Sequence, residues 1–122
     1  MAEFANPFSG MVPGRKLTTG ELVRAIRLDV AAEEEAIHLY MAQADAVEDP
    51  LAREVLIDIA DEERVHVGEF QRVLQLLTGD EDTWLADGAA EVDRMAAEVG
   101  MPAQQEAAPP AAEEPTIGSL RE

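Results

Sequence analysis

The chain has 122 residues, 26 acidic side chains against 9 basic ones, and no cysteine. Its net charge of -17 repels phosphate backbones and anionic membranes, so we expect no nucleic-acid or membrane partner. The same charge favours cationic partners, including metal ions. The lack of cysteine excludes disulfides, thiolate zinc sites and iron-sulfur clusters, leaving oxygen and imidazole ligands for any metal. No apolar run suits a membrane span and no signal-peptide pattern opens the chain, so we expect one soluble, cytoplasmic domain.

An irregular arm is predicted over residues 1–17, because this stretch combines turn formers with apolar side chains that follow no period. Phe4, Phe8 and Met11 are its apolar members and are candidates for packing on a neighbouring chain. The arm precedes the helical domain, which we place at residues 18–99.

The first long helix is predicted to begin near Thr18 and to end at a turn before Pro50. Thr18 and Glu21 have the spacing of a capping box, and an apolar residue follows at once. Asp49 suits the cap of the next helix and Pro50 its first position. One face of the first helix is apolar apart from two acids, and its members are Leu22, Ile26, Asp29, Glu33, Ala36 or Ile37, Tyr40, Ala44 and Val47.

The second long helix is predicted over about Pro50 to Leu77, with Gly79 as its left-handed terminator. Its apolar face has spacings that alternate three and four, and the members are Leu56, Ile59, Glu63, His66, Phe70, Val73 and Leu77. A buried, unpaired carboxylate is costly. Glu63 and His66 within this face therefore imply a partner charge, a hydrogen-bond network or a metal ion.

The remainder of the chain is predicted to contain a shorter helix, a tether and a terminal peptide. The helix covers about Asp82 to Val99. Residues 100–115 are mainly Ala, Pro, Glu and Gln, which bury too little apolar surface to fold, and we interpret them as a flexible linker. Residues 116–122 regain two apolar anchors around a glycine, as in a short docking peptide. The members of this peptide that we expect to bind are Thr116, Ile117, Gly118, Ser119, Leu120 and Arg121.

A two-helix hairpin cannot enclose a core, so we predict an all-α fold in which two copies pair into a four-helix bundle. Each copy then contributes Glu33 from the first helix, and Glu63 and His66 from the second. Residues three apart on a helix lie on one face, so Glu63 and His66 can reach the same ion. Iron accepts carboxylate and imidazole together, which favours a di-iron centre between two subunits. Tyr40, two turns after Glu33, is a candidate hydrogen-bond partner of a liganding carboxylate.

Each of these candidates has a plain structural alternative. Glu33 can instead be an acid at the core edge that pairs with Arg64 or Arg53, and Tyr40 can be an ordinary tyrosine at the rim of the core. A solvated or interface position is the favoured interpretation for the neighbouring polar residues, with a metal role as the minority one, and these are Glu34, Glu35, His38, Glu62 and Glu69.

Two stretches, residues 29–40 (DVAAEEEAIHLY) and 61–66 (DEERVH), resemble the ferritin-like superfamily, in particular its rubrerythrin-type and encapsulated-ferritin branches. The resemblance implies that Glu33, Glu63 and His66 are iron ligands and that the tyrosine of the first stretch lies near the site. Full-length ferritins carry two such motifs in one chain. The single motif here implies, as in encapsulated ferritins, a site that forms between subunits.

The resemblance also implies a function. It predicts a ferroxidase that oxidises Fe(II) to Fe(III) with dioxygen or peroxide, for storage and mineralisation of iron inside an encapsulin nanocompartment of a prokaryote. Residues 116–121 are similar to the cargo-loading peptides that dock enzymes inside encapsulin shells. We expect a homo-oligomer, a dimer at minimum or a ring of dimers. Ala32 and Leu39 depart from the annular members, which carry an acid and a tryptophan there.

Two other functions fit the same residues. A rubrerythrin-like peroxide scavenger would use the same ligands, and without cysteine it would need an external reductant. A non-enzymatic helical adaptor would use its acids for solubility and its tail for recruitment to a shell. Turnover with peroxide against dioxygen separates the first alternative from a ferroxidase, and stoichiometric metal separates the second.

Overall fold

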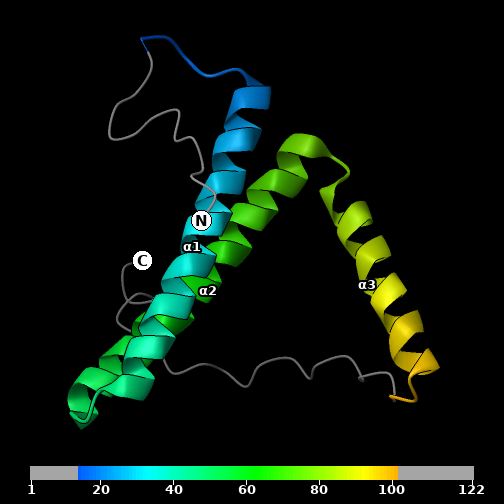
Figure 1. Ribbon diagram of the computed structural model, residues 1–122. Coiled ribbons are helices and arrows are strands. Elements are labelled where there is room, and N and C mark those ends of the chain that lie inside the picture. Colours follow the sequence, from blue (N-terminus) through cyan, green and yellow to red (C-terminus); the bar gives the residue numbers. More distant parts are fainter. Residues whose placement is uncertain (1–13, 102–122) are drawn as a thin grey trace, which may run out of the picture. The chain divides into compact units, whose positions relative to one another are not determined.

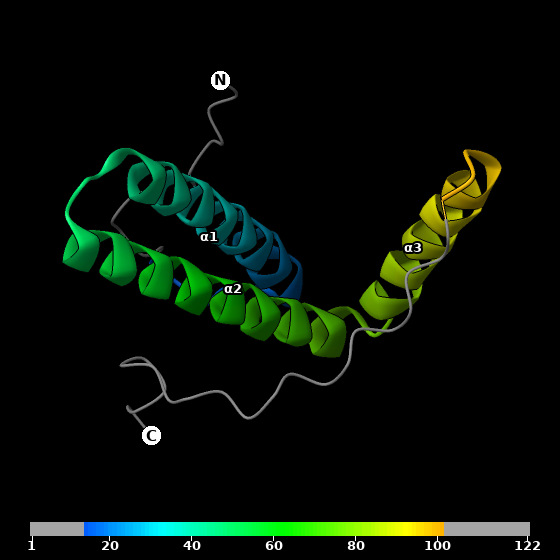
Figure 2. The same cartoon turned by 90° about the horizontal axis from the view of Figure 1, so that it is seen from below.

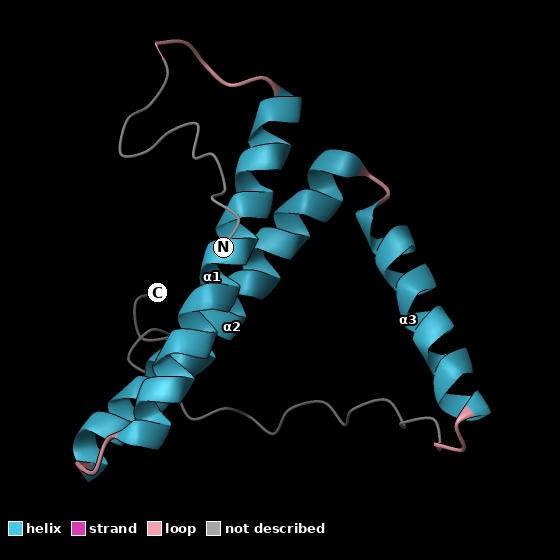
Figure 3. Cartoon of the chain, in the orientation of Figure 1, coloured by secondary structure: helices cyan, strands magenta, loops and turns pink. Residues whose placement is uncertain are grey.

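The computed structural model describes residues 14–101, which contain three α-helices and no strand. The chain divides into two units, Met1–Thr78 and Gly79–Glu122. The first unit contains a hairpin of two long helices and the second a single helix (Figures 1 and 3). None of these three helices has an apolar stretch long enough to span a bilayer. The all-α prediction is confirmed, whereas the predicted arm before Gly14 and the predicted linker and tail from Pro102 onward lie outside the described residues.

Helix α1 (Thr19–Ala46) begins at the predicted capping box. The Thr18 hydroxyl accepts a hydrogen bond from the Glu21 N–H at 3.2 Å, and the Glu21 carboxylate accepts one from the Thr18 N–H at 3.0 Å. Arg15 adds a contact that the sequence pattern did not indicate: its guanidinium donates to both Glu21 oxygens, at 2.7 and 2.8 Å. The hydrogen bonds from Arg15 and from the Thr18 N–H lower the pKa of Glu21 to about 2.

Helix α2 (Pro50–Thr78) runs antiparallel to α1 and beside it (Figures 1 and 2). Its start is capped as predicted, because the Asp49 carboxylate accepts a hydrogen bond from the Leu51 N–H at 3.2 Å. It ends before Gly79, whose φ of 77° lies in the left-handed region that favours glycine. These local signals place the middle of α2 opposite the middle of α1.

The seam between α1 and α2 is narrow, and its buried members are Ile26, Ala44, Ala60 and Leu74. The predicted apolar face of α2 was only partly right, because Ile59 and Val73 stay 38% and 39% exposed while the next residues, Ala60 and Leu74, are buried. One residue along a helix turns the side chain by about 100°. Helix α1 therefore covers one edge of the apolar arc of α2 and leaves the other edge open.

Helix α3 (Glu81–Glu98) forms the second unit and agrees with the predicted bounds to within one residue at each end. Near its first turn the Trp84 indole N–H donates a hydrogen bond to the Asp80 carboxylate at 3.0 Å. The chain leaves the helix at Gly100, which has a φ of 80°. No residue of this helix is buried.

Candidate metal centre

Three metal-ligand side chains meet at the middle of the hairpin. Glu33 comes from α1, and Glu63 and His66 come from adjacent turns of α2. His66 Nδ1 lies 3.6 Å from Glu63 Oε2 and 3.8 Å from Glu33 Oε1, and one ligand atom of each residue lies within 4.8 Å of the others. The structure therefore brings together the three residues that the sequence singled out.

The cluster lies at the edge of the seam rather than inside it. The side chains of Glu33 and Glu63 are 20% and 18% exposed, whereas that of His66 is 43% exposed. Two neighbouring carboxylates repel each other, and a cation between them removes that repulsion. The open side of the imidazole leaves room for ligands from outside the chain.

The donor set and its spacing fit a metal ion. Carboxylate oxygen and imidazole nitrogen are a suitable combination for iron, and no sulfur is needed. Ligand atoms bound at about 2.1 Å to one ion lie about 3 to 4 Å apart, depending on the angle between the bonds. The distances of 3.6 and 3.8 Å from His66 Nδ1 fall in this range. Three donors from one chain leave coordination positions open.

The alternative partner for Glu33 is not found among the residues that the structure describes. Arg64 pairs with Asp61 of its own helix at 3.5 Å, and the ionisable group beside Glu33 is His66. The solvated interpretation holds for four neighbouring polar residues, which are exposed: Glu34, Glu35, His38 and Glu69. Tyr40 is half-buried on α1, and its hydrogen bond to a liganding carboxylate stays a prediction.

Apolar side chains surround the cluster on α2. Ile59 lies about one turn before Glu63, and Val73 lies about two turns after His66; both are more than a third exposed. We call the surface formed by Glu33, Ile59, Glu63, His66 and Val73 the metal flank. A polar centre framed by exposed apolar residues is the composition of a surface that pairs with another protein surface.

An antiparallel hairpin with a glutamate on one helix and a Glu-x-x-His step on the other has the ligand pattern that four-helix bundles use for carboxylate and imidazole metal centres. Comparison with known proteins agrees with this class. Residues 22–114 match the family model described as rubrerythrin, and the chain belongs to that family.

Two curated relatives and one solved structure extend the comparison. The chain is 44% identical over 72 residues to the encapsulin nanocompartment cargo protein EncC of Myxococcus xanthus, covering 59% of this chain and 55% of that protein. It is 41% identical over 78 residues to the ferritin-like-encapsulin shell fusion protein of Pyrococcus furiosus, covering 64% of this chain and 23% of that protein. The chain thus spans about half of the first relative and about a quarter of the second.

The solved structure is the encapsulated ferritin domain from Pyrococcus furiosus. It superimposes with a TM-score of 0.69 at 35% identity, over 79% of this chain and 97% of that domain. The ferritin-like fold predicted from the two helical motifs is therefore confirmed.

Proposed function

We propose that this protein is a ferroxidase that oxidises Fe(II) to Fe(III) at a di-iron site formed by two copies of the chain. The observation that supports it is the meeting of Glu33, Glu63 and His66 on a half-exposed surface with open coordination positions. A second copy related by a two-fold axis adds the same three donors. The six donors of the pair match the carboxylate-rich set of di-iron bundles.

The proposed site residues have two roles, which are to bind iron and to balance its charge. Iron would be the substrate of the redox step: two Fe(II) ions would each give one electron, and the two electrons together would reduce dioxygen to peroxide or peroxide to water. The Glu33 and Glu63 carboxylates would hold the two cations, because their negative charge would offset the repulsion between the cations. His66 would supply a nitrogen donor to the iron. Tyr40 is proposed to hold a liganding carboxylate in place through its hydroxyl.

The two histidines of the chain provide the test of this proposal. His66→Ala removes a proposed ligand, whereas His38→Ala removes an exposed histidine outside the cluster. We expect iron oxidation, followed by ferric absorbance, to be lost in the first variant and kept in the second, with equal helical circular dichroism. Unchanged oxidation in His66→Ala contradicts the site. Faster turnover with peroxide than with dioxygen, without ferric mineral, favours the scavenger, and lack of bound metal favours the adaptor.

We also propose that the chain works inside an encapsulin nanocompartment. The support is the name of two relatives, one a nanocompartment cargo protein and one fused to a shell, together with the terminal peptide at residues 116–121. Deleting residues 116–122 should stop co-purification with a co-expressed encapsulin shell while iron oxidation continues. Deleting residues 104–110 is the matched control, since it shortens the linker by the same length and keeps the peptide. Loading that survives loss of the peptide contradicts the proposal.

A further inference from the structure

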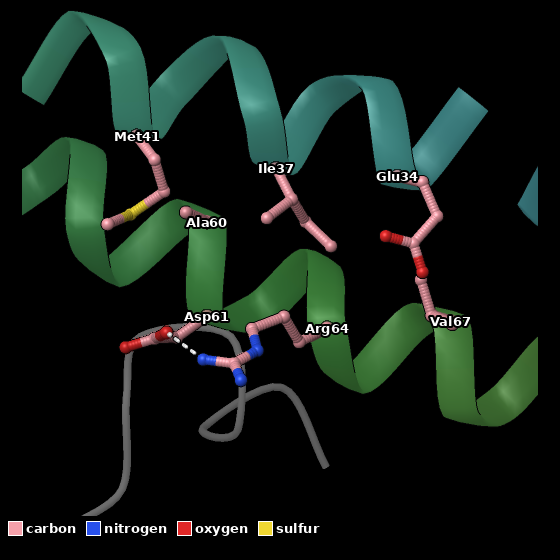
Figure 4. A pocket seen from close by; sticks show the side chains of 7 residues that line it. All are labelled: Glu34, Ile37, Met41, Ala60, Asp61, Arg64 and Val67. Atoms are coloured by element: carbon pink, nitrogen blue, oxygen red, sulfur yellow. Dashed lines mark ion pairs between the residues drawn. The ribbon is translucent and has the colours of Figure 1, made fainter. Parts of the chain in front are cut away.

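The side of the hairpin away from the metal flank has a groove of about 500 Å³ between α1 and α2. Ile37 and Met41 descend into it from α1, and Ala60 and Val67 line it on α2 (Figure 4). Ala60 is only 1% exposed and forms the floor, whereas Met41 is 39% exposed and forms an open wall. The groove is apolar at its base and open to solvent above.

The rim of the groove carries one matched pair of charges and, in addition, the Glu34 carboxylate. Arg64 and Asp61 form an ion pair at 3.5 Å along one edge, drawn as a dashed line in Figure 4. An anionic occupant would be repelled by the Glu34 and Asp61 carboxylates, whereas an uncharged aromatic ring would not. The Arg64 guanidinium can also lie over the face of a ring placed in the groove, which adds a cation–π contact. The lining therefore disfavours an anionic occupant and suits an uncharged aromatic side chain.

The arm before α1 contains such side chains. Two of the three phenylalanines of the chain, Phe4 and Phe8, lie in residues 1–13, and the third is Phe70 of α2. The arm starts at a fixed point, since the Arg15 guanidinium is tied to Glu21 in the first turn of α1 by two hydrogen bonds. An arm anchored there has a defined reach along the hairpin.

The reach selects one of the two phenylalanines. From Glu21 to Met41 the helix advances by 20 residues, or about 30 Å at 1.5 Å per residue. From Arg15 back to Phe4 there are 11 residues, which extend to about 36 Å at 3.3 Å per residue. This leaves about 6 Å for the arm to pass round α1. Phe8 is only seven residues from Arg15 and reaches about 23 Å, which falls short of Met41.

We infer that the N-terminal arm folds back along the hairpin and places the Phe4 ring in the groove between Met41 and Ala60 of the same chain. The arm is thereby held on the side of the hairpin that does not carry the metal ligands, and the metal flank stays open for a second copy. The inference does not depend on iron chemistry.

Cysteine pairs test the placement, because the chain contains no cysteine that could react instead. Phe4→Cys is combined with Met41→Cys in the groove, or with Leu39→Cys as the control. Leu39 is 49% exposed and lies at the same height on α1, but two residues earlier and hence on another face. After mild oxidation with diamide, we expect at least tenfold more disulfide in the Met41 pair than in the Leu39 pair, at the mass of one chain.

Three results would overturn the inference. Equal cross-linking at the two positions means that the arm has no fixed site. A cross-link at the mass of two chains means that the groove receives a neighbouring copy.

Methyl-labelled methionine supplies a second measurement in otherwise unmodified protein. The ring current of Phe4 should shift the Met41 methyl signal, and Phe4→Ala should remove the shift while Phe8→Ala keeps it. Loss of the shift in Phe8→Ala alone would also overturn the assignment.

Discussion

The metal flank and the groove flank belong to the same two helices and differ in chemistry. The metal flank has two carboxylates and an imidazole among exposed apolar side chains, so its charge is left for a cation to balance. The groove flank, which is formed by the groove lining and its rim, has an apolar base, the ion pair between Arg64 and Asp61, and the Glu34 carboxylate. The comparison teaches that one amphipathic hairpin can present two surfaces, one suited to a metal and a second copy and one to an apolar side chain.

Adjacent glutamates on α1 give the sharpest test of this comparison, because Glu33 belongs to the metal flank and Glu34 to the groove flank. Glu33→Gln keeps the size of the side chain and removes a charged ligand, and we expect iron oxidation to fall by about 100-fold or more. Glu34→Gln should leave the rate unchanged. Both rates are measured by ferric absorbance at equal protein and iron concentration. A similar loss in both variants would show that the flanks do not differ as described.

A charge placed among the exposed apolar residues of the metal flank should have the next largest effect. Val73→Asp should weaken association of two copies by about 100-fold or more, because pairing would bury an unmatched carboxylate. Iron oxidation should fall with it. The control is Val65→Asp, since Val65 is 48% exposed on α2 but lies outside the metal flank. Light scattering gives the mass and circular dichroism checks the helices. A paired, active Val73→Asp variant would place the interface elsewhere.

Removing the proposed groove occupant should have a smaller effect, and on stability rather than activity. Phe4→Ala should lower the free energy of unfolding by about 1 to 2 kcal/mol, the value for a ring buried in part. Phe8→Ala should lower it by less. Chemical denaturation followed by circular dichroism measures both, and iron oxidation should stay the same in each. A loss of oxidation in Phe4→Ala would mean that the two flanks are coupled.

The smallest expected effect is a pH dependence at the anchor of the arm. The pKa of Glu21 is lowered from 4.5 to about 2 in the folded chain. Its contribution to stability is therefore present above pH 4.5 and is lost as the pH falls from there toward 2. We expect metal-free protein to lose helical signal over this window to a greater extent than the Glu21→Gln variant, whose side chain does not titrate. Equal curves would contradict a role for the carboxylate.

The bounds of all three helices could be predicted because the signals that set them are local. Thr18 with Glu21, Asp49 and Gly79 act within one turn of the helix ends, through hydrogen bonds or backbone conformation. The site could be predicted for a related reason. Glu63 and His66 lie three residues apart, which places them on one face of any α-helix.

Local signals did not predict which residues of α1 and α2 pack against each other. Periodicity shows that α2 has an apolar arc, but Ile59 and Ala60 both lie on that arc, and only the packing of α1 decides that Ala60 is buried. The same holds for the groove at Met41 and for the contact from Arg15 to Glu21, six residues apart and outside any helical repeat. The sequence by itself determined the helices and the Glu63 and His66 pair of candidate ligands, since these follow from short-range geometry. Tertiary structure decided which edge of each apolar arc is covered. The arc of a helix is wider than the surface that one neighbouring helix can cover, so several packings are compatible with the same sequence pattern.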